Sequence, residues 1–443
     1  MSLANPLERL VLFTRYPEPG KTKTRLIPSL GPRGAAELQR QMTEHVLDRV
    51  CGLRGSRHVE LEVRYEGGNR ALMEKWLGPD VSYRSQGRGD LGARMARTFA
   101  KAFHQGVDRV VIVGSDCPGV TEATVGTGFD LLNEFDLVLG PANDGGYYLI
   151  GLRQEKLQLF QDIPWGTAEV RARTLEIANQ LGLEWIEVEP LGDVDRAEDI
   201  EVWESEATSM QDSPQPAISI IIPTLNEAEN LPATLASTKS SVDLEVIVVD
   251  GGSSDETPQL AKSFGVRLLT TTASRARQIN AAGLAARSEV LLFLHGDTRL
   301  PPGFESYVQD VLAMPGIVAG AFSLGIDGFE YGLRIIEMLA NFRSHLFQMP
   351  YGDQAIFLKK EIFRAVGGFP DMVLMEDFVL MQQLKKRGRV AILPVAVKTS
   401  PRRWLRLGIL KTTLVNQAVL LAYFLGSDHE RLARWYRRAT LRD

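Results

Sequence analysis

The sequence predicts an α/β protein with two tandem domains, each built on a mostly parallel sheet. The chain has 443 residues, more than one ordinary hydrophobic core accommodates. Both halves begin alike, because residues 9–16 and 217–224 are apolar, β-rich runs that each lead into a polar loop with proline. Further short apolar runs alternate with helical stretches, a pattern typical of parallel strands that helices cover on both faces.

The domain boundary is expected at residues 206–216, whose Ser, Pro and Gln content and lack of apolar periodicity are typical of a linker. We therefore predict domains at 1–205 and 217–443, the second ending in a basic and apolar helical segment. Further strands are expected in the first domain at 58–65, 109–116, 136–142 and 184–190, and in the second at 244–252, 266–271 and 289–297.

The composition favours a cytoplasmic enzyme. A net charge of −5 with interspersed acids and bases does not call for a nucleic-acid partner. The two cysteines, Cys51 and Cys117, are too few for a disulfide framework or a zinc cluster. The first ten residues lack the basic start and apolar run of an export signal.

Polar motifs follow the expected strands of the second half, where parallel sheets bind ligands. Pro223, Asn226 and Glu227 follow the first strand, and Asp250 opens the segment DGGSSD after the second. Carboxylates and a close backbone suit a base or ribose, although DGGSSD could equally be a turn with a helix cap. Asp297 follows the next strand and, with phosphate oxygens, suits a divalent cation. Arg275 and Gln278 precede it in SRARQ, and arginine suits phosphate.

Two later motifs suit transfer chemistry. Glu376 and Asp377 stand at an expected helix start, where they could complement the helix dipole or take a proton from an acceptor hydroxyl. Arg402, Arg403 and Trp404 offer cations and an aromatic ring for a diphosphate or a sugar face.

Together, the ordered motifs PTLNE, VVDGGSSD, LHGDT, GDQ, GGF, MED and RRW resemble the inverting family-2 glycosyltransferases, whose domain is the Rossmann-like GT-A fold. The resemblance implies that Asp250 contacts the nucleoside of a nucleotide sugar, that Asp297 binds Mg²⁺ or Mn²⁺, and that Asp377 is the catalytic base with Glu376 beside it. His295 stands where the family usually has the first Asp of Asp-x-Asp. The variant HGDT is most similar to the subgroup labelled arsenosugar-biosynthesis glycosyltransferases.

The first half carries a glycine-containing cationic loop, with Gly20, Lys21, Lys23 and Arg25, that follows the first strand and enters a helix. Such a loop suits a triphosphate, although a solvated basic turn is the alternative. Its spacing is not that of a Walker loop.

Further ligand-binding candidates in the first half include Gln86 and Asp90, which lie in a second glycine-rich segment. Asp116 and Asp144 follow strands and could share magnesium ions across a triphosphate. These segments resemble the nucleotidyltransferase-like group of GT-A domains related to cofactor guanylyltransferases, which implies an NTP ligand.

The basic and apolar segment 402–438 has two interpretations. Its uninterrupted apolar core, residues 418–425, is too short to span a bilayer, which takes about 20 residues. The helix could pack on its own domain, or it could lie on an anionic membrane surface at the cytoplasmic face.

We therefore predict a metal-dependent glycosyltransferase that uses a nucleotide sugar and inverts the anomeric carbon, fused to a nucleotidyltransferase-like domain. The alternatives are a single transferase activity with a non-catalytic nucleotide-binding first domain, and a nucleotide-binding scaffold without catalysis.

Overall fold

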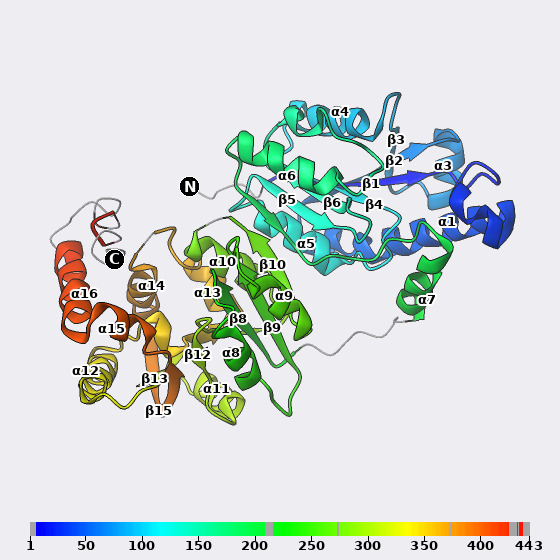
Figure 1. Ribbon diagram of the computed structural model, residues 1–443. Helices are drawn as coiled ribbons and strands as arrows, with labels where there is room; N and C mark the ends of the chain where they lie inside the picture. The colour runs from blue at the N-terminus through cyan, green and yellow to red at the C-terminus, as the bar shows by residue number, and fades with distance from the viewer. Residues whose placement is uncertain are drawn as a thin grey trace. The chain divides into compact units, whose positions relative to one another are not determined.

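The computed structural model describes residues 6–208, 216–272, 274–372, 374–424, 432 and 434–436. The chain divides into two compact units, residues 1–213 and 214–443, each treated by itself below (Figure 1). The division falls within residues 206–216. Helix α7 (Ile200–Thr208) continues past residue 205 into that segment.

The N-terminal unit is a twisted sheet with the strand order β3-β2-β1-β4-β6-β5-β7, in which β6 alone is antiparallel to its neighbours β4 and β5. Its elements before α7 are β1 (Glu8–Arg15), η1 (Thr24–Leu26), α1 (Ile27–Cys51), α2 (Leu53–Ser56), β2 (Val59–Glu66), α3 (Arg70–Leu77), β3 (Ser82–Ser85), α4 (Leu91–His104), β4 (Arg109–Gly114), α5 (Glu122–Leu131), β5 (Leu137–Pro141), β6 (Tyr147–Leu152), η2 (Leu157–Phe160), α6 (Val170–Gln180), β7 (Trp185–Glu187) and η3 (Ala197–Asp199).

The C-terminal unit has the strand order β10-β9-β8-β11-β14-β13-β15-β12, with β14 antiparallel to β11 and β13, and β12 antiparallel to β15. Its elements are β8 (Ile218–Thr224), α8 (Leu231–Ser237), β9 (Leu244–Asp250), α9 (Thr257–Ser263), β10 (Arg267–Thr271), α10 (Arg275–Ala285), β11 (Val290–Phe293), β12 (Thr298–Arg299), α11 (Phe304–Ala313), β13 (Ile317–Ile326), α12 (Tyr331–Phe347), η4 (Gly352–Gln354), β14 (Phe357–Lys359), α13 (Lys360–Val366), α14 (Glu376–Lys385), β15 (Arg389–Thr399), α15 (Arg402–Leu407) and α16 (Ile409–Phe424).

The two units share one topology. If the short edge strand β12 is left out, both sheets run third, second, first, fourth, sixth, fifth and seventh strand in chain order. In both sheets, the first strand lies between the second and the fourth. The chain therefore adds the second and third strands on one side of the first strand and the later strands on its other side. Open α/β sheets bind ligands at such a switch point. The predicted α/β class with mostly parallel sheets is confirmed.

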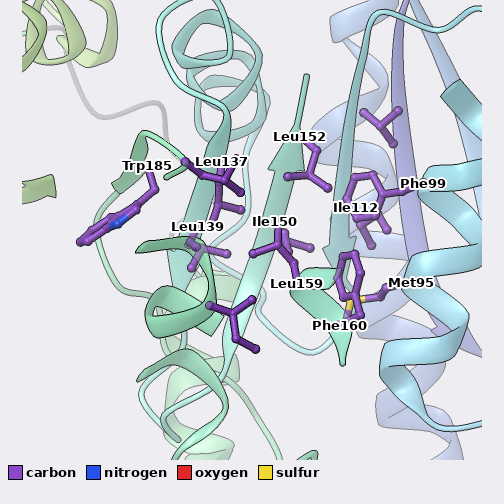
Figure 2. Close-up of a cluster of buried hydrophobic side chains, with 14 of the residues drawn as sticks. Met95, Phe99, Ile112, Leu137, Leu139, Ile150, Leu152, Leu159, Phe160 and Trp185 are labelled. Carbon is purple, nitrogen blue, oxygen red and sulfur yellow. The ribbon is translucent and has the colours of Figure 1, made fainter. Parts of the chain in front are cut away.

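The N-terminal core forms where apolar side chains of the central strands meet α4 and α6, which cover one face of the sheet while α1 and α5 cover the other (Figure 1). Figure 2 shows Phe99 of α4 near Ile112 of β4, with Ile150 and Leu152 of β6 beside Leu137 and Leu139 of β5. Both faces of these strands are covered, which explains why their sequences are continuous apolar runs.

In the C-terminal unit, alternate residues of β8 point to opposite faces. Ile218, Ile220 and Ile222 pack with α8, α9 and α11. On the other face, Phe293 at the end of β11 packs edge-on against Phe369, with ring centroids 5.0 Å apart, and lies 5.5 Å from the Phe363 ring. This packing surrounds the carboxyl end of β11 with aromatic side chains, directly before the polar segment that carries His295 and Asp297.

Candidate functional site

The candidate site of the C-terminal unit lies where β8 and β9 end, and two loops interlock there. Asn226 has a positive φ of 55°, and its Oδ1 accepts a hydrogen bond from Ser254 N at 2.9 Å. Asp250 is buried, and its Oδ2 accepts hydrogen bonds from Gly252 N at 3.0 Å and Ser253 N at 2.9 Å. The carboxylate of Asp250 therefore orders its own turn, the structural alternative considered for DGGSSD.

Asp297 follows β11 and belongs to a carboxylate pair with a cation. Glu227, after β8, accepts a hydrogen bond from Arg402 at 2.7 Å, and the same guanidinium nitrogen is 3.7 Å from Asp297 Oδ2. Burial, followed by the charge of Glu227, raises the pKa of Asp297 above its usual value. The hydrogen bond from Ser400 N to Asp297 O, at 3.0 Å, brings the end of β15 to this edge. Three predicted residues from distant parts of the chain thus meet.

Arg275 links the middle of the site to the acidic helix start. Its guanidinium contacts the ring nitrogen Nε2 of His295, and its Nε is 3.9 Å from Glu376 Oε1. Burial, followed by the charge of Asp377, raises the pKa of Glu376 to about 6. This carboxyl therefore holds a proton near neutral pH more readily than an exposed glutamate does.

Asp377 is oriented by two backbone groups. Its Oδ2 accepts a hydrogen bond from Gly352 N at 2.7 Å, and its Oδ1 accepts one from Phe378 N at 2.7 Å. A Cβ on residue 352 would lie 2.8 Å from His295 Nε2 and 3.5 Å from Asp377 Oδ2. Alanine at residue 352 would therefore force the His295 ring to shift.

The remaining motifs of this half connect α10 to the turns that border the site. The amide of Asn280 bonds both backbone groups of Phe369, at 2.8 Å each, and so fixes the GGF turn to α10. Asp371, just after that turn, accepts a hydrogen bond from Arg277 Nε at 2.9 Å. Gln278 is buried, and a Cβ on residue 251 would lie 2.3 Å from its Nε2, so Gln278 supports the turn after β9.

One cavity gathers much of this set. It is lined by Pro223, Arg275, Ile279, Phe293, Leu294, His295, Gly352, Ile356, Phe369, Glu376 and Asp377. Trp404 instead packs on an apolar cluster with Leu324, Ile326 and Leu333, which favours a packing role. The side chain of Arg403 lies outside the described part of the chain.

In the N-terminal unit, all three loop cations meet acidic groups. Lys23 is buried, lies 2.7 Å from Asp116 Oδ1 and donates a hydrogen bond to Val194 O at 2.6 Å. Arg25 pairs with Asp195. Lys21 is exposed and lies 2.7 Å from Glu18. The loop therefore folds over the edge of the sheet that carries Asp116.

The motifs missed at this edge belong to the segment GDVD after β7. Burial, followed by the charge of Asp144, raises the pKa of Asp193 to about 6. The sequence signal was present, because Asp193 and Asp195 follow a strand just as Asp116 does. Cys117 is buried, and burial raises the pKa of its thiol well above the usual value, in keeping with a spacer rather than reactive thiol chemistry.

Two other predicted residues of this unit are committed to backbone contacts. Gln86 is buried and donates from Nε2 to Thr14 O at 3.0 Å and to Arg64 O at 3.1 Å, which ties the ends of β1 and β2 together. Asp90 caps α4 by accepting a hydrogen bond from Ala93 N at 2.8 Å. Gly20, with φ 82°, has open space around the position of a Cβ.

The two units place opposite charges at equivalent points of one topology. After the first strand, the N-terminal unit has the cation Lys23 and the C-terminal unit the anion Glu227. After the seventh strand of the shared order, β7 or β15, the N-terminal unit has Asp195 and the C-terminal unit Arg402. Both keep an aspartate after the fourth strand, Asp116 or Asp297. A shared scaffold thus carries two different charge patterns.

Within the described residues, no group of three or more His, Cys, Asp or Glu side chains is arranged to hold a metal ion. A cation at Asp297 would therefore depend on oxygens from its ligand as well. Among the helices described, none is long and apolar enough to cross a membrane.

The class of protein that this fold and site define is a pair of α/β domains of one topology, each with charged side chains gathered at the switch point of its sheet. Comparison with family models finds one match within each unit. Residues 219–368 match the model described as "Glycosyl transferase family 2", and residues 50–167 match "Uncharacterized protein conserved in bacteria (DUF2064)". The C-terminal unit is thus similar to family-2 glycosyltransferases over residues 219–368, and the N-terminal unit to DUF2064 proteins over residues 50–167.

Individual relatives cover only parts of the chain. A PGL/p-HBAD biosynthesis glycosyltransferase of Mycobacterium bovis (strain BCG / Pasteur 1173P2) is 34% identical over 171 residues, which are 35% of this chain and 63% of that protein. The chain thus spans somewhat less than two thirds of the length of this relative.

Among solved structures, a protein of Desulfovibrio desulfuricans G20, provisionally described as a nucleotide-diphospho-sugar transferase, is 35% identical with a TM-score of 0.43, covering 46% of this chain and 89% of that one. The mannosyltransferase PcManGT of Pyrobaculum calidifontis is 21% identical with a TM-score of 0.38, covering 50% and 69%.

Proposed function

We propose that the C-terminal unit transfers a sugar from a nucleoside-diphosphate donor to an acceptor hydroxyl, with inversion at the anomeric carbon. The observation that carries this proposal is that Asp377 and Glu376 line one cavity with Arg275 and His295, two residues before Asp297. An acid–base group and groups that suit a diphosphate thus lie within one site of a family-2 glycosyltransferase domain.

In the proposed reaction, Asp377 takes the proton of the acceptor hydroxyl while the hydroxyl oxygen attacks the anomeric carbon. The bond from that carbon to the diphosphate breaks, and the diphosphate leaves with the electron pair. Asp377 is suited to this role because Gly352 N and Phe378 N fix its orientation before substrate arrives. The guanidinium groups of Arg275 and Arg402 would bind the leaving diphosphate and neutralise its negative charge.

A divalent cation, Mg²⁺ or Mn²⁺, fits Asp297. The carboxylate is crowded by Glu227, and a cation would relieve that repulsion in place of Arg402. When bound, the ion would neutralise the diphosphate. His295 contacts Arg275, so it is better placed to orient that arginine than to complete the usual pair of aspartates.

The experiment that tests this function is a mass-spectrometric screen of nucleotide sugars for turnover or hydrolysis by the whole chain. We expect one nucleotide sugar to release its nucleoside diphosphate, and Asp297→Asn to abolish that release. Binding of nucleotide sugars without release, with and without a pool of acceptor extracts, would instead favour the scaffold alternative.

For the N-terminal unit, we propose binding of an NTP with Mg²⁺ and nucleotidyl transfer. Two observations support this proposal. Lys23 pairs with Asp116, and Asp144 lies close enough to Asp193 to raise its pKa, so a cation and several carboxylates lie at one edge of the sheet. Calorimetric titration of an Asp297→Asn chain with NTPs tests this unit with the C-terminal metal ligand removed. Absence of heat with every NTP would contradict the proposal and leave the glycosyltransferase proposal standing.

A further inference from the structure

Helix α12 of the C-terminal unit presents an apolar stripe to solvent. Six of its apolar side chains are between 42% and 81% exposed: Tyr331, Ile335, Met338, Leu339, Phe342 and Leu346. At 100° per residue their spacing places them on one arc of roughly 100° of the helix. Phe329, just before the helix, is fully exposed as well. Soluble surfaces rarely expose so large a continuous apolar patch without a partner.

The opposite side of α12 fixes the direction of this stripe. Leu333, Ile336 and Ala340 pack on a cluster that includes Leu324 of β13. The amide of Asn341 accepts from Leu324 N at 2.7 Å and donates to Leu324 O at 3.0 Å. The helix is therefore held in one orientation by its own unit, and the stripe points outward for that reason.

A basic segment packs against α12 through Trp404. Trp404 of α15 belongs to the apolar cluster under α12, and α16 follows α15 along the chain (Figure 1). Residues 401–443 contain nine Arg and Lys against three Asp and Glu, although the whole chain carries a net charge of −5. Arg406 and Lys411 of this segment are exposed. Arg406 lies two residues after Trp404, so the described part of this segment carries exposed positive charge close to the cluster that α12 packs on.

We propose that α12, with the basic segment beside it, docks the C-terminal unit onto an anionic lipid membrane surface. An apolar helix face flanked by arginine and lysine has the chemistry of an interfacial helix, in which the stripe enters the acyl boundary and the cations meet phosphate groups. A second copy of the chain is the less suitable occupant, because two such faces would bring two positively charged segments together.

For residues 402–438, the sequence leaves open a membrane contact or packing on the same domain, and residues 425–431, 433, 437 and 438 lie outside the described part of the chain. In the proposed contact, the exposed stripe of α12 supplies the apolar part. The segment then supplies charge. Apolar substitutions in α12 and basic substitutions in the segment should therefore have separable effects on membrane binding.

The test is flotation of the whole chain with phosphatidylcholine vesicles, either pure or containing about 30% phosphatidylserine. We expect binding to the anionic vesicles that weakens in high salt. The double variant Met338→Ser with Phe342→Ser should lower the partition coefficient by about tenfold or more. A matched control, Phe264→Ser with Met314→Ser, removes the same two residue types from exposed positions elsewhere and should stay within about twofold of wild type.

A second pair, Arg406→Gln with Lys411→Gln, should remove the preference for anionic vesicles and leave residual binding to neutral ones. Absence of binding to anionic vesicles, or equal binding by the α12 variant and its control, would overturn the proposal. Light scattering without lipid that shows a dimer, dissociated by the α12 variant alone, would also overturn it in favour of a second copy.

Discussion

Replacement of Asp377 by asparagine separates its chemical role from its structural one. The two carboxylate oxygens accept backbone hydrogen bonds from Gly352 and Phe378, whereas asparagine has a single acceptor oxygen, so one N–H would face an amide NH₂. We expect the free energy of unfolding to fall by about 1–2 kcal/mol. The loss of the base should lower the transfer rate by about 10²–10⁴-fold, which corresponds to about 3–5 kcal/mol.

The assay measures kcat and the donor KM from release of the nucleoside diphosphate, together with urea denaturation of each variant. Donor KM should stay near wild type, because the asparagine keeps the shape of the cavity. Asp353→Asn in the neighbouring GDQ segment is the matched control and should retain most activity. Full activity of Asp377→Asn together with inactivity of Asp353→Asn would refute the reasoning and make Asp353 the base.

Further predictions address other parts of both units. The fold raises the pKa of Glu376 from 4.5 to about 6, so ionisation of Glu376 lowers the free energy of unfolding as pH rises through this window. Glu376→Gln should therefore add about 1–2 kcal/mol to the free energy of unfolding near pH 8 and almost nothing near pH 4. Urea denaturation of both proteins at the two pH values measures this difference. Asp297→Asn should make nucleoside-diphosphate binding, measured by calorimetry, equal with and without EDTA; a wild-type chain that is itself insensitive to EDTA would remove the metal role. Gly352→Ala should lower kcat strongly, because its Cβ would meet His295 Nε2 at 2.8 Å; unchanged kcat would show that the segment can shift at no cost. Arg25→Ala should weaken NTP binding by about 1.5–3 kcal/mol in a titration, unless the Arg25–Asp195 pair is purely structural, in which case affinity will not change.

The apolar runs predicted β1, β2, β4, β5 and β7 to β11, because buried parallel strands are continuous in sequence. They did not predict β3, β6 or β12 to β15. The strand β3 is a short polar edge strand, SYRS, and β14 has only three residues. For such strands, pairing partners rather than local pattern decide the conformation. The finer assignments, namely the arsenosugar-type subgroup and the nucleotidyltransferase-like group, stay predictions from motif resemblance.

By itself, the sequence determined the α/β class and which polar residues follow the strands. Both signals, the apolar runs of buried strands and the polar residues after them, come from residues that are neighbours in the sequence. Tertiary structure alone decided which of those residues meet. Arg402 forms a hydrogen bond with Glu227, which lies 175 positions earlier in the chain. Gly352 N donates a hydrogen bond to Asp377, and Asp250 accepts one from Gly252 N of its own turn. Tertiary structure also exposed the α12 stripe, since an amphipathic pattern shows that a helix has an apolar face but not whether a second layer covers it. Contacts between distant segments depend on the shared sheet order of the two units, and no local pattern contains that order.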